Sequence, residues 1–352
     1  MTSPRDRTGN ESERRAAQIG AAALAASALL AWVAPMAAAP AYRFAAFACL
    51  QPALGSLIFA LIYRITGGQW GEKLDPFFRG GIRLVPWIWP LIALLALVPS
   101  SHPSFARQPP GPHNPGPGLI LARALVYEGV FIALRFIALR PALKRLAAPG
   151  LLALVFTLHF LAADWFFTLE PGWSSTGFPL VWMSVQATAG LAFAILLAAL
   201  AGNSPATVGP AGRPYGQDWG NLLLTAVVFS TYVAFMEFLV IWSGNLPPEI
   251  RWFLRRDNGL WRAVIIALAL FHLLFPFSCL LSKSLKASRL GLPRIAGVVC
   301  GAELLWCAWF ILPPFQDRGP WLACLCATLL IAGGGLFVNR FLADLPRGGA
   351  IP

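Results

Sequence analysis

Charged side chains are scarce in this sequence. They make up 12% of its 352 residues, about half of what soluble domains carry, while 57% of the residues are hydrophobic. The mean hydropathy is +0.65, and apolar stretches close to the roughly 20 residues that cross a bilayer as a helix recur along the chain. The composition therefore excludes a soluble globular fold and indicates an integral membrane protein embedded in a lipid bilayer.

The sequence also lacks the alternation of apolar and polar residues that marks the strands of a membrane β-barrel. In lipid, backbone N–H and C=O groups must bond within the protein, which leaves a bundle of α-helices as the structure that fits. We expect an all-α polytopic membrane protein of about ten transmembrane helices.

Cysteine motifs for metal centres are absent. None of the cysteines belongs to a Cys-x-x-Cys-His haem attachment site or to an iron–sulfur run. Cys324 and Cys326 are separated by one residue, so on a helix they point to different faces. We therefore expect no metal redox centre and no covalently bound cofactor on this chain.

Acidic residues are few, 15 against 27 lysines and arginines, and the formal net charge is +12. The basic residues are scattered over short loops without a stripe of interleaved aromatics, so membrane topology explains them and nucleic acid is not an expected partner. Most of them fall on the side of the predicted spans that holds both termini, which the positive-inside rule places in the cytoplasm. The exception is a group of arginines on the outer side: Arg251, Arg255, Arg256 and Arg262.

The predicted spans alternate with polar or proline-rich loops. They cover residues 17–39, 44–65, 84–98, 119–139, 151–167, 178–201, 222–242, 260–281, 295–312 and 321–338. The first has an Ala-rich end like a signal-peptide cleavage site, but its apolar run is longer than a typical h-region, which favours an uncleaved helix. The third is short and contains Pro86 and Pro90, which remove helix hydrogen bonds.

The chain divides into two membrane halves. Residues 1–16 have no apolar content to fold around, and we expect a disordered cytoplasmic segment there. The first half, with helices 1 to 6, covers 17–201, and a linker rich in Gly, Pro and Ser follows at 202–218. The second half, with helices 7 to 10, covers 219–340, and 341–352 is a cytoplasmic tail.

Ionisable side chains inside the predicted spans cost at least about 2.5 to 3.5 kcal/mol each to insert, so each needs a partner, a water-filled cavity or a function. The candidates for a proton path or another intramembrane role are Asp164, Glu237, His272, His159, Glu128 and Arg135. Glu128 and Arg135 share a helix face but lie about 10 Å apart along the axis, so they cannot pair directly. His159 and Asp164 face different directions. Glu303, near a predicted helix start, is interpreted as structural.

Glu237 and His272 each leave more than one interpretation open. Glu237 has no basic residue in its own span, and such a carboxyl either relays protons or stays neutral and hydrogen-bonded to another helix. His272 stands four residues before Pro276, where a histidine can transfer protons, bond a quinone or be a satisfied core residue.

The stretch Phe160–Thr176 interrupts the apolar sequence with two carboxylates, a proline and a glycine, and contains no lysine or arginine. We predict that it forms the tip of a helical hairpin on the outer side of the membrane. Four tryptophans fall near predicted span ends, where an interfacial aromatic belt explains them: Trp165, Trp173, Trp242 and Trp261.

A series of short motifs runs in a fixed order between about Ile65 and Leu281. They are Thr66-Gly-Gly, Asp164-Trp165, Leu169-Glu170-Pro171, Asp218-Trp-Gly-Asn-Leu, Asn245-Leu-Pro and Trp252-Phe-Leu-Arg-Arg, followed by His272 and Pro276-Phe277. In this combination the sequence resembles the integral membrane F-type subunit of bacterial alternative complex III, within the polysulfide-reductase-like (NrfD-like) membrane family. It departs from the family pattern at Gly172 and Ser174, where a histidine and an aromatic are usual.

The resemblance implies two four-helix bundles plus two peripheral helices in the bacterial inner (cytoplasmic) membrane. The chain would be a non-catalytic or quinone-adjacent subunit of a respiratory quinol:cytochrome c (electron acceptor) oxidoreductase, serving as a structural anchor and a proton path. Asp164, His159 and His272 carry over by position, whereas Glu237 does not.

The same resemblance implies partners. They are the other membrane and periplasmic subunits of the complex, which include haem c and iron–sulfur subunits and a C-type paralogue, and quinone is a candidate ligand. The alternatives are a stand-alone multi-pass transporter, which predicts discontinuous helices and a midplane cavity, and the quinol-oxidising anchor of a molybdenum oxidoreductase.

Overall fold

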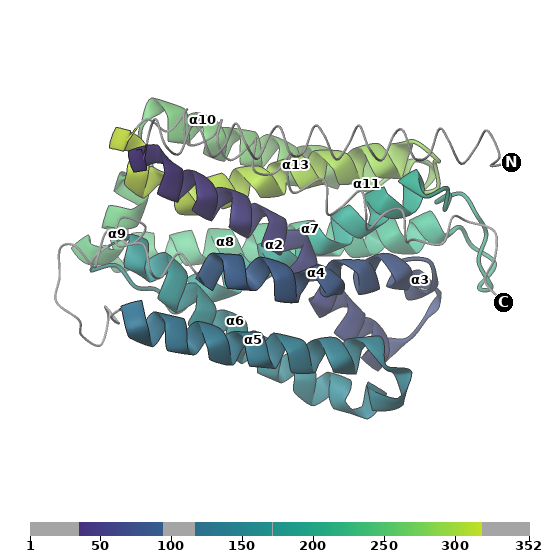
Figure 1. Ribbon diagram of the computed structural model, residues 1–352. Coiled ribbons are helices and arrows are strands. Elements are labelled where there is room, and N and C mark those ends of the chain that lie inside the picture. The colour runs from purple at the N-terminus through teal and green to yellow at the C-terminus, as the bar shows by residue number, and fades with distance from the viewer. Residues whose placement is uncertain (1–34, 94–116, 171, 319–352) are drawn as a thin grey trace, which may run out of the picture.

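The computed structural model describes residues 35–93, 117–170 and 172–318, and these residues form helices joined by short turns (Figure 1). No strand occurs in these three ranges, where an isolated bridge joins Val208 and Pro214. The predicted all-α class is therefore confirmed. The predicted spans 17–39 and 321–338 lie outside the described residues, except for 35–39 at the start of the first described helix.

The helical elements follow one another along the chain in this order. They are α2 (Pro35–Thr66), α3 (Gln69–Glu72), α4 (Asp75–Ala93), α5 (Pro117–Leu139), η3 (Pro141–Leu146), α6 (Ala147–Phe166), η4 (Phe167–Leu169), α7 (Phe178–Leu200), α8 (Tyr215–Gly244), α9 (Pro247–Leu254), α10 (Gly259–Leu268), η5 (Ala269–Leu274), α11 (Phe275–Leu280), α12 (Lys283–Lys286), α13 (Gly291–Ile311) and η6 (Pro313–Arg318).

Six stretches of the described chain are long and apolar enough to cross a membrane. They are Ala39–Thr66, Pro141–Leu169, Phe178–Leu200, Tyr215–Gly244, Gly259–Leu280 and Gly291–Ile311. The counterparts of the third and fourth predicted spans, α4 and α5, are not among them, and each carries three charged side chains. The structure thus supports a multi-pass membrane protein, and the count of about ten spans stays a prediction.

The helices pack in two groups. α2, α4, α5 and α6 pack together, and α7, α8, the α10 to α11 span and α13 form the second group. α7 also packs against α2 and α6, and α13 packs against α2, so the two groups share a seam along α2 and α7. The packing therefore places α7 between the two groups, in contact with helices of both.

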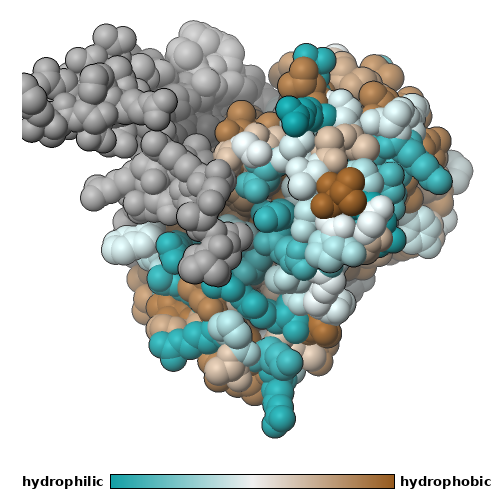
Figure 2. Space-filling view, turned by 90° about the vertical axis from the view of Figure 1, so that its right-hand side faces the viewer, coloured by the Kyte–Doolittle hydropathy of each residue, from teal (hydrophilic) through white to brown (hydrophobic). Residues whose placement is uncertain are grey.

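The two ends of the bundle carry different loops. The hairpin tip, α9 and the ends of α8 and α13 lie at one end, here called the tip end, and α3, α12 and the 202–214 loop lie at the other, the linker end (Figure 1). Figure 2 looks onto the linker end, where hydrophilic side chains gather and apolar side chains flank them. The tip and the 243–258 loop share one end, as the predicted topology requires.

Hydrogen bonds join α3 to the start of α8 at the linker end. The Gln69 Nε2 atom donates to Asp218 Oδ2 at 2.7 Å, and the Tyr215 hydroxyl donates to Glu72 Oε2 at 2.8 Å. The indole Nε1 of Trp219 donates to the Trp70 carbonyl at 3.0 Å. These contacts fix the first turn of α8 against α3, so the helix begins before its apolar stretch does.

Glycine closes the seam between α2 and α7. A Cβ atom on Gly55 would lie 1.9 Å from the Gln186 carbonyl oxygen, and one on Gly190 would lie 2.5 Å from Gly55 Cα. Such small-residue contacts let membrane helices approach backbone to backbone, where van der Waals packing rather than the hydrophobic effect holds them. The seam therefore admits no side chain at these two positions.

Candidate functional site

A line of polar side chains crosses the second group of helices. The Thr188 Oγ1 atom of α7 lies 3.5 Å from Ser230 Oγ of α8, and Ser230 Oγ lies 2.9 Å from His272 Nε2. His272 Nδ1 then lies 3.2 Å from Glu303 Oε1 of α13. All four residues are at most 2% exposed. The line thus links four of the six membrane spans, α7 among them, through groups that can hold or pass a proton.

Glu303 is the acid of this line. Its contact with His272 has the distance of an ion pair but not the angle of a hydrogen bond, and neither carboxylate oxygen has a hydrogen-bond partner among the described residues. A carboxyl and an imidazole that share one proton carry zero net charge whichever group holds it, which a membrane interior tolerates. The pair can therefore shift a proton between its members without creating a net charge.

His272 stands in a π-helical turn. The next proline, Pro276, has no N–H to donate to the carbonyl four residues earlier, which is that of His272. The backbone widens accordingly, and the Phe275 N–H bonds to the Leu270 carbonyl instead. Turns of this kind are frequent at functional sites. The spacing of His272 and Pro276 in the sequence is thus the cause of the local geometry.

Glutamines from the α2–α7 seam add to the buried polar groups. The Gln51 Nε2 atom donates to the Glu303 carbonyl at 3.4 Å. Gln186 is fully buried, and both atoms of its amide lack a partner among the described residues, as does the indole N–H of Trp306. Buried polar atoms of this kind are commonly bonded by ordered water. The centre of the second group is therefore polar, although apolar helices surround it.

Glu237 lies nearer the tip end than the sequence suggested. Its carboxylate accepts a hydrogen bond from the Ser175 hydroxyl, whose oxygen accepts from the N–H groups of Gly177 and Phe178, 3.1 Å away, at the start of α7. Glu237 is half-buried and follows Ser230 by seven residues, so it lies about 10 Å farther along the same face of α8. It thus stands between the tip and the buried line.

Asp164 is held by α5. Its two carboxylate oxygens accept from Arg123 NH1 and from the Tyr127 hydroxyl, each at 2.6 Å. Asp164 is buried, whereas the Arg123 side chain is 45% exposed. Arg123 and Tyr127 are four residues apart and therefore lie on one face of α5, a spacing visible in the sequence. Their pairing with Asp164 was not predicted.

The remaining predicted residues stay apart from these clusters. His159 is half-buried, and its ring centre lies 5.7 Å from that of Phe160 in an edge-on arrangement. It lies on a different side of α6 from Asp164. Glu128 and Arg135 are both half-buried, and none of the ion pairs of the described residues joins them. Glu128 Oε2 is buried without a hydrogen-bond partner in the described part of the chain.

Two side chains of the hairpin tip are buried, those of Glu170 and Trp173, whereas Gly172, Ser174 and Thr176 are exposed. Glu170 contacts two guanidinium groups, those of Arg256 and Arg255, each at 3.3 Å. The Trp173 indole stacks on Trp252 of α9 with ring centres 5.3 Å apart. Trp252 of α9 and the two arginines that follow this helix therefore hold the tip. The cluster of Glu170, Trp173, Trp252, Arg255 and Arg256 is here called the clasp.

Arg256 is the centre of this clasp. Its guanidinium donates to the carbonyls of Trp309, Trp252 and Phe310 at 3.0, 2.7 and 3.4 Å and lies 3.5 Å above the Trp252 ring. The carbonyls of Trp309 and Phe310 belong to the last turn of α13, which has no partners within the helix. Arg256 thus caps α13 while it pairs with Glu170.

These contacts correct one sequence interpretation. Trp165, Trp173 and Trp261 are at most 5% exposed, so the aromatic-belt explanation is wrong for them, and it stays a prediction for Trp242, which is 68% exposed. Three of the four arginines that the predicted topology places outside are paired, because Glu170 contacts Arg255 and Arg256 and Asp257 contacts Arg262 at 2.6 Å. The positive-inside rule counts lysines and arginines and gives carboxylates little weight, so these arginines stay the exception to the predicted orientation.

Burial governs the ionisation of the clasp. It raises the pKa of the Glu170 carboxyl, while the guanidinium groups of Arg256 and Arg255 act in the opposite direction. Burial lowers the pKa of Arg256 to about 9, and the Glu170 carboxylate opposes that shift. Because this value stays well above neutral pH, Arg256 keeps its charge and its hydrogen bonds.

No protein-family model matches this chain, and no curated protein matches it. Among the described residues, no three His, Cys, Asp or Glu side chains meet as a metal site.

Proposed function

We propose that the chain is a membrane-embedded subunit of a respiratory quinol:cytochrome c (electron acceptor) oxidoreductase of the alternative complex III type. In this proposal it anchors the other subunits and carries a proton path through its second group of helices. The buried contact of His272 with Glu303 carries the proposal, because an isolated ionisable pair at that depth is costly without a function. The motifs between residues 65 and 281 supply the type of complex.

The path follows the contacts among the buried polar side chains. Glu303 and His272 hold one proton between them, and the Ser230 hydroxyl accepts or donates at His272 Nε2 according to the tautomer. Glu237 and Ser175 connect the same face of α8 to the tip end. Water bridges the distance of about 10 Å between Ser230 and Glu237. Asp164, paired with Arg123, is a structural ion pair in this scheme.

Glu303→Gln should lower turnover and coupled proton release of the assembled complex on the order of 10²-fold, the contribution of a positioned proton-transfer group. The amide preserves shape and polarity but cannot exchange a proton. The measurement is quinol oxidation with simultaneous proton release in proteoliposomes. Asp257→Asn is the matched control, since Asp257 is an exposed outer carboxylate paired with Arg262, and should leave both rates unchanged.

Membership of the complex is tested separately. The chain purified from native membranes should bring haem c and iron–sulfur subunits with it. A chain that purifies without these subunits would contradict the proposal. Normal turnover and proton release by complexes with Glu303→Gln would remove the proton path and leave the anchor. If that variant does not assemble, His272→Gln with the same two readings decides the question.

The transporter alternative has less support. It predicts discontinuous helices and a solute cavity near the membrane midplane. The Gly259–Leu280 span continues through its π turn, and the groove between the two groups is lined almost wholly by apolar side chains. The anchor of a molybdenum oxidoreductase remains the alternative within the same superfamily, and its subunits would appear in the same purification.

A further inference from the structure

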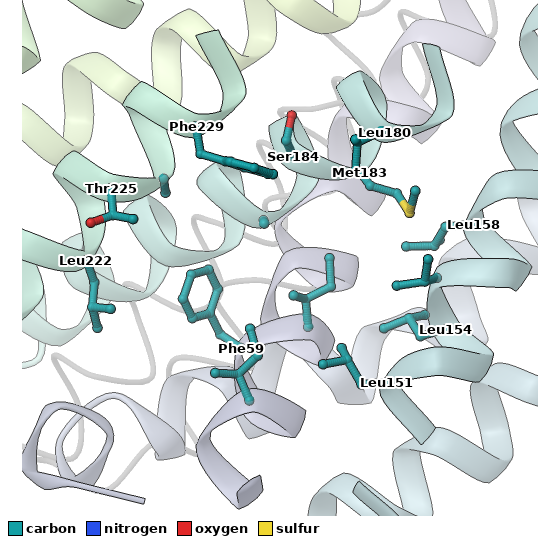
Figure 3. Close-up of a pocket in the computed structure, with 15 residues that line it drawn as sticks. Phe59, Leu151, Leu154, Leu158, Leu180, Met183, Ser184, Leu222, Thr225 and Phe229 are labelled. Carbon is teal, nitrogen blue, oxygen red and sulfur yellow. The ribbon is translucent and has the colours of Figure 1, made fainter. Parts of the chain in front are cut away.

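A groove opens between α6 and α8, with α2 and α7 as its floor (Figure 3). It has a volume of about 360 Å³ and lies within four of the six spans that can cross the membrane. Each helix contributes apolar side chains that point into it, such as Phe59, Leu154, Met183 and Phe229. The groove is therefore apolar over the part of these helices that can lie within the membrane.

The hydroxyl groups in the lining do not change this character. Ser184 Oγ donates to the Val181 carbonyl at 2.7 Å, and Thr225 Oγ1 donates to the Asn221 carbonyl at 2.9 Å. Both hydroxyl groups donate to carbonyls of their own helices, so neither has a hydrogen left to donate to the phosphate of a polar head group. A ligand must be held in the groove by its apolar part and recognised elsewhere by its polar part.

A basic turn stands at the linker end of α6. Lys144 and Arg145 of η3 are exposed, and none of the ion pairs of the described residues includes them. Lys144 precedes Leu151, which lines the groove, by seven residues, about 10 Å along the axis. Unpaired basic residues next to a membrane helix attract the phosphates of anionic lipids. The two features together suit an amphipathic molecule with a negative head.

We propose that the groove binds an acyl chain of an anionic phospholipid whose phosphate bonds to Lys144 and Arg145. The lipid fills the space between the two groups of helices and holds them together. This proposal is independent of the respiratory role, because it needs only the bilayer and the shape and charge of this face.

The test uses the full chain in nanodiscs with a phosphatidylglycerol that carries a photoreactive group in the middle of its acyl chain. Labelling, mapped by mass spectrometry, should be several-fold higher at Met183 and Phe229 than at Phe156 and Phe160, which are 63% and 56% exposed on α6. Lys144→Gln with Arg145→Gln should reduce groove labelling several-fold. Arg289→Gln with Arg294→Gln, two exposed basic residues at the same end, is the matched control and should not.

Four results would overturn the proposal. Equal labelling of the groove and of the exposed face would show ordinary contact with bulk lipid. Equal labelling of the groove by a phosphatidylcholine probe would show that the lipid need not be anionic. Unchanged labelling after the Lys144 and Arg145 changes would show that these two residues do not bind the head group. Groove labelling by a photoreactive isoprenoid quinone, with none by the phospholipid, would assign the groove to a quinone tail.

Discussion

Arg256→Ala is expected to lower the free energy of unfolding by about 3 to 5 kcal/mol, the usual cost of removing one partner of a buried ion pair. The change leaves Glu170, which is 4% exposed, without its buried cation, and it takes donors from the carbonyls of Trp309 and Trp252. In addition, the Trp252 ring loses a cation that lies 3.5 Å from its centre.

Arg255→Ala is the matched control for this change. Arg255 contacts the same carboxylate at the same 3.3 Å, but its side chain is 29% exposed, so we expect a loss of about 1 kcal/mol or less. Unfolding in detergent by heat or by denaturant, followed through tryptophan fluorescence, measures both variants. Arg256→Lys should fall between them, because an ammonium cannot reproduce the planar fork of donors. Equal stability of the Arg256→Ala and Arg255→Ala variants would contradict a central role for Arg256.

Hydropathy predicts the six stretches of the described residues that can cross a membrane, because it reports the part of a helix that lies in hydrocarbon. The predicted span 178–201 corresponds to α7, Phe178–Leu200. Hydropathy does not predict the helical turns that extend beyond the hydrocarbon. α8 begins at Tyr215 rather than 222, since contacts with Gln69 and Glu72 stabilise its polar first turn. α4 likewise begins at Asp75, nine residues before the predicted span.

The pairing of ionisable groups is harder to predict, because the partners lie on different helices. Each member of the Asp164–Arg123 and His272–Glu303 pairs is visible in the sequence as a charge in an apolar run, but their contacts depend on how helices pack. One signal was available for Glu303. It lies on the same stripe of α13 as Val299, Trp306 and Phe310, all buried, so the helical period alone points it inward.

The ion pairs of Glu170 with Arg255 and Arg256 are contacts that a count of lysines and arginines along the sequence does not include. Glu170 and the four outer arginines lie more than eighty positions apart in the sequence, and the positive-inside rule treats those arginines as free charges. In the folded chain, Glu170 and Asp257 satisfy three of them. A count of lysines and arginines cannot show the ion pairs of Glu170, because the partners come from loops far apart in the sequence.

Gly55→Ala should destabilise the protein by about 1 to 3 kcal/mol, the usual cost of overpacking, and Gly55→Leu by more. The new Cβ would lie 1.9 Å from the Gln186 carbonyl oxygen and 2.7 Å from Gly190 Cα. Both are backbone atoms, which cannot rotate away as a flexible side chain would, so α2 and α7 must separate. The loss of close packing along this seam has no compensation from the hydrophobic effect in lipid.

Gly129→Ala separates this steric effect from the general effect of removing a glycine. Gly129 is exposed in α5, and a Cβ there meets nothing within 4 Å, so the change should stabilise the helix by about 0.5 to 1 kcal/mol. Unfolding midpoints in detergent compare the two variants, and equal midpoints would show that the seam is looser than its geometry indicates. Because Gln51 of α2 bonds to the Glu303 carbonyl, separation of the seam should also reduce proton release by the assembled complex. A destabilised Gly55→Ala variant with unchanged proton release would place the proton path away from the seam, on the α8 side of His272.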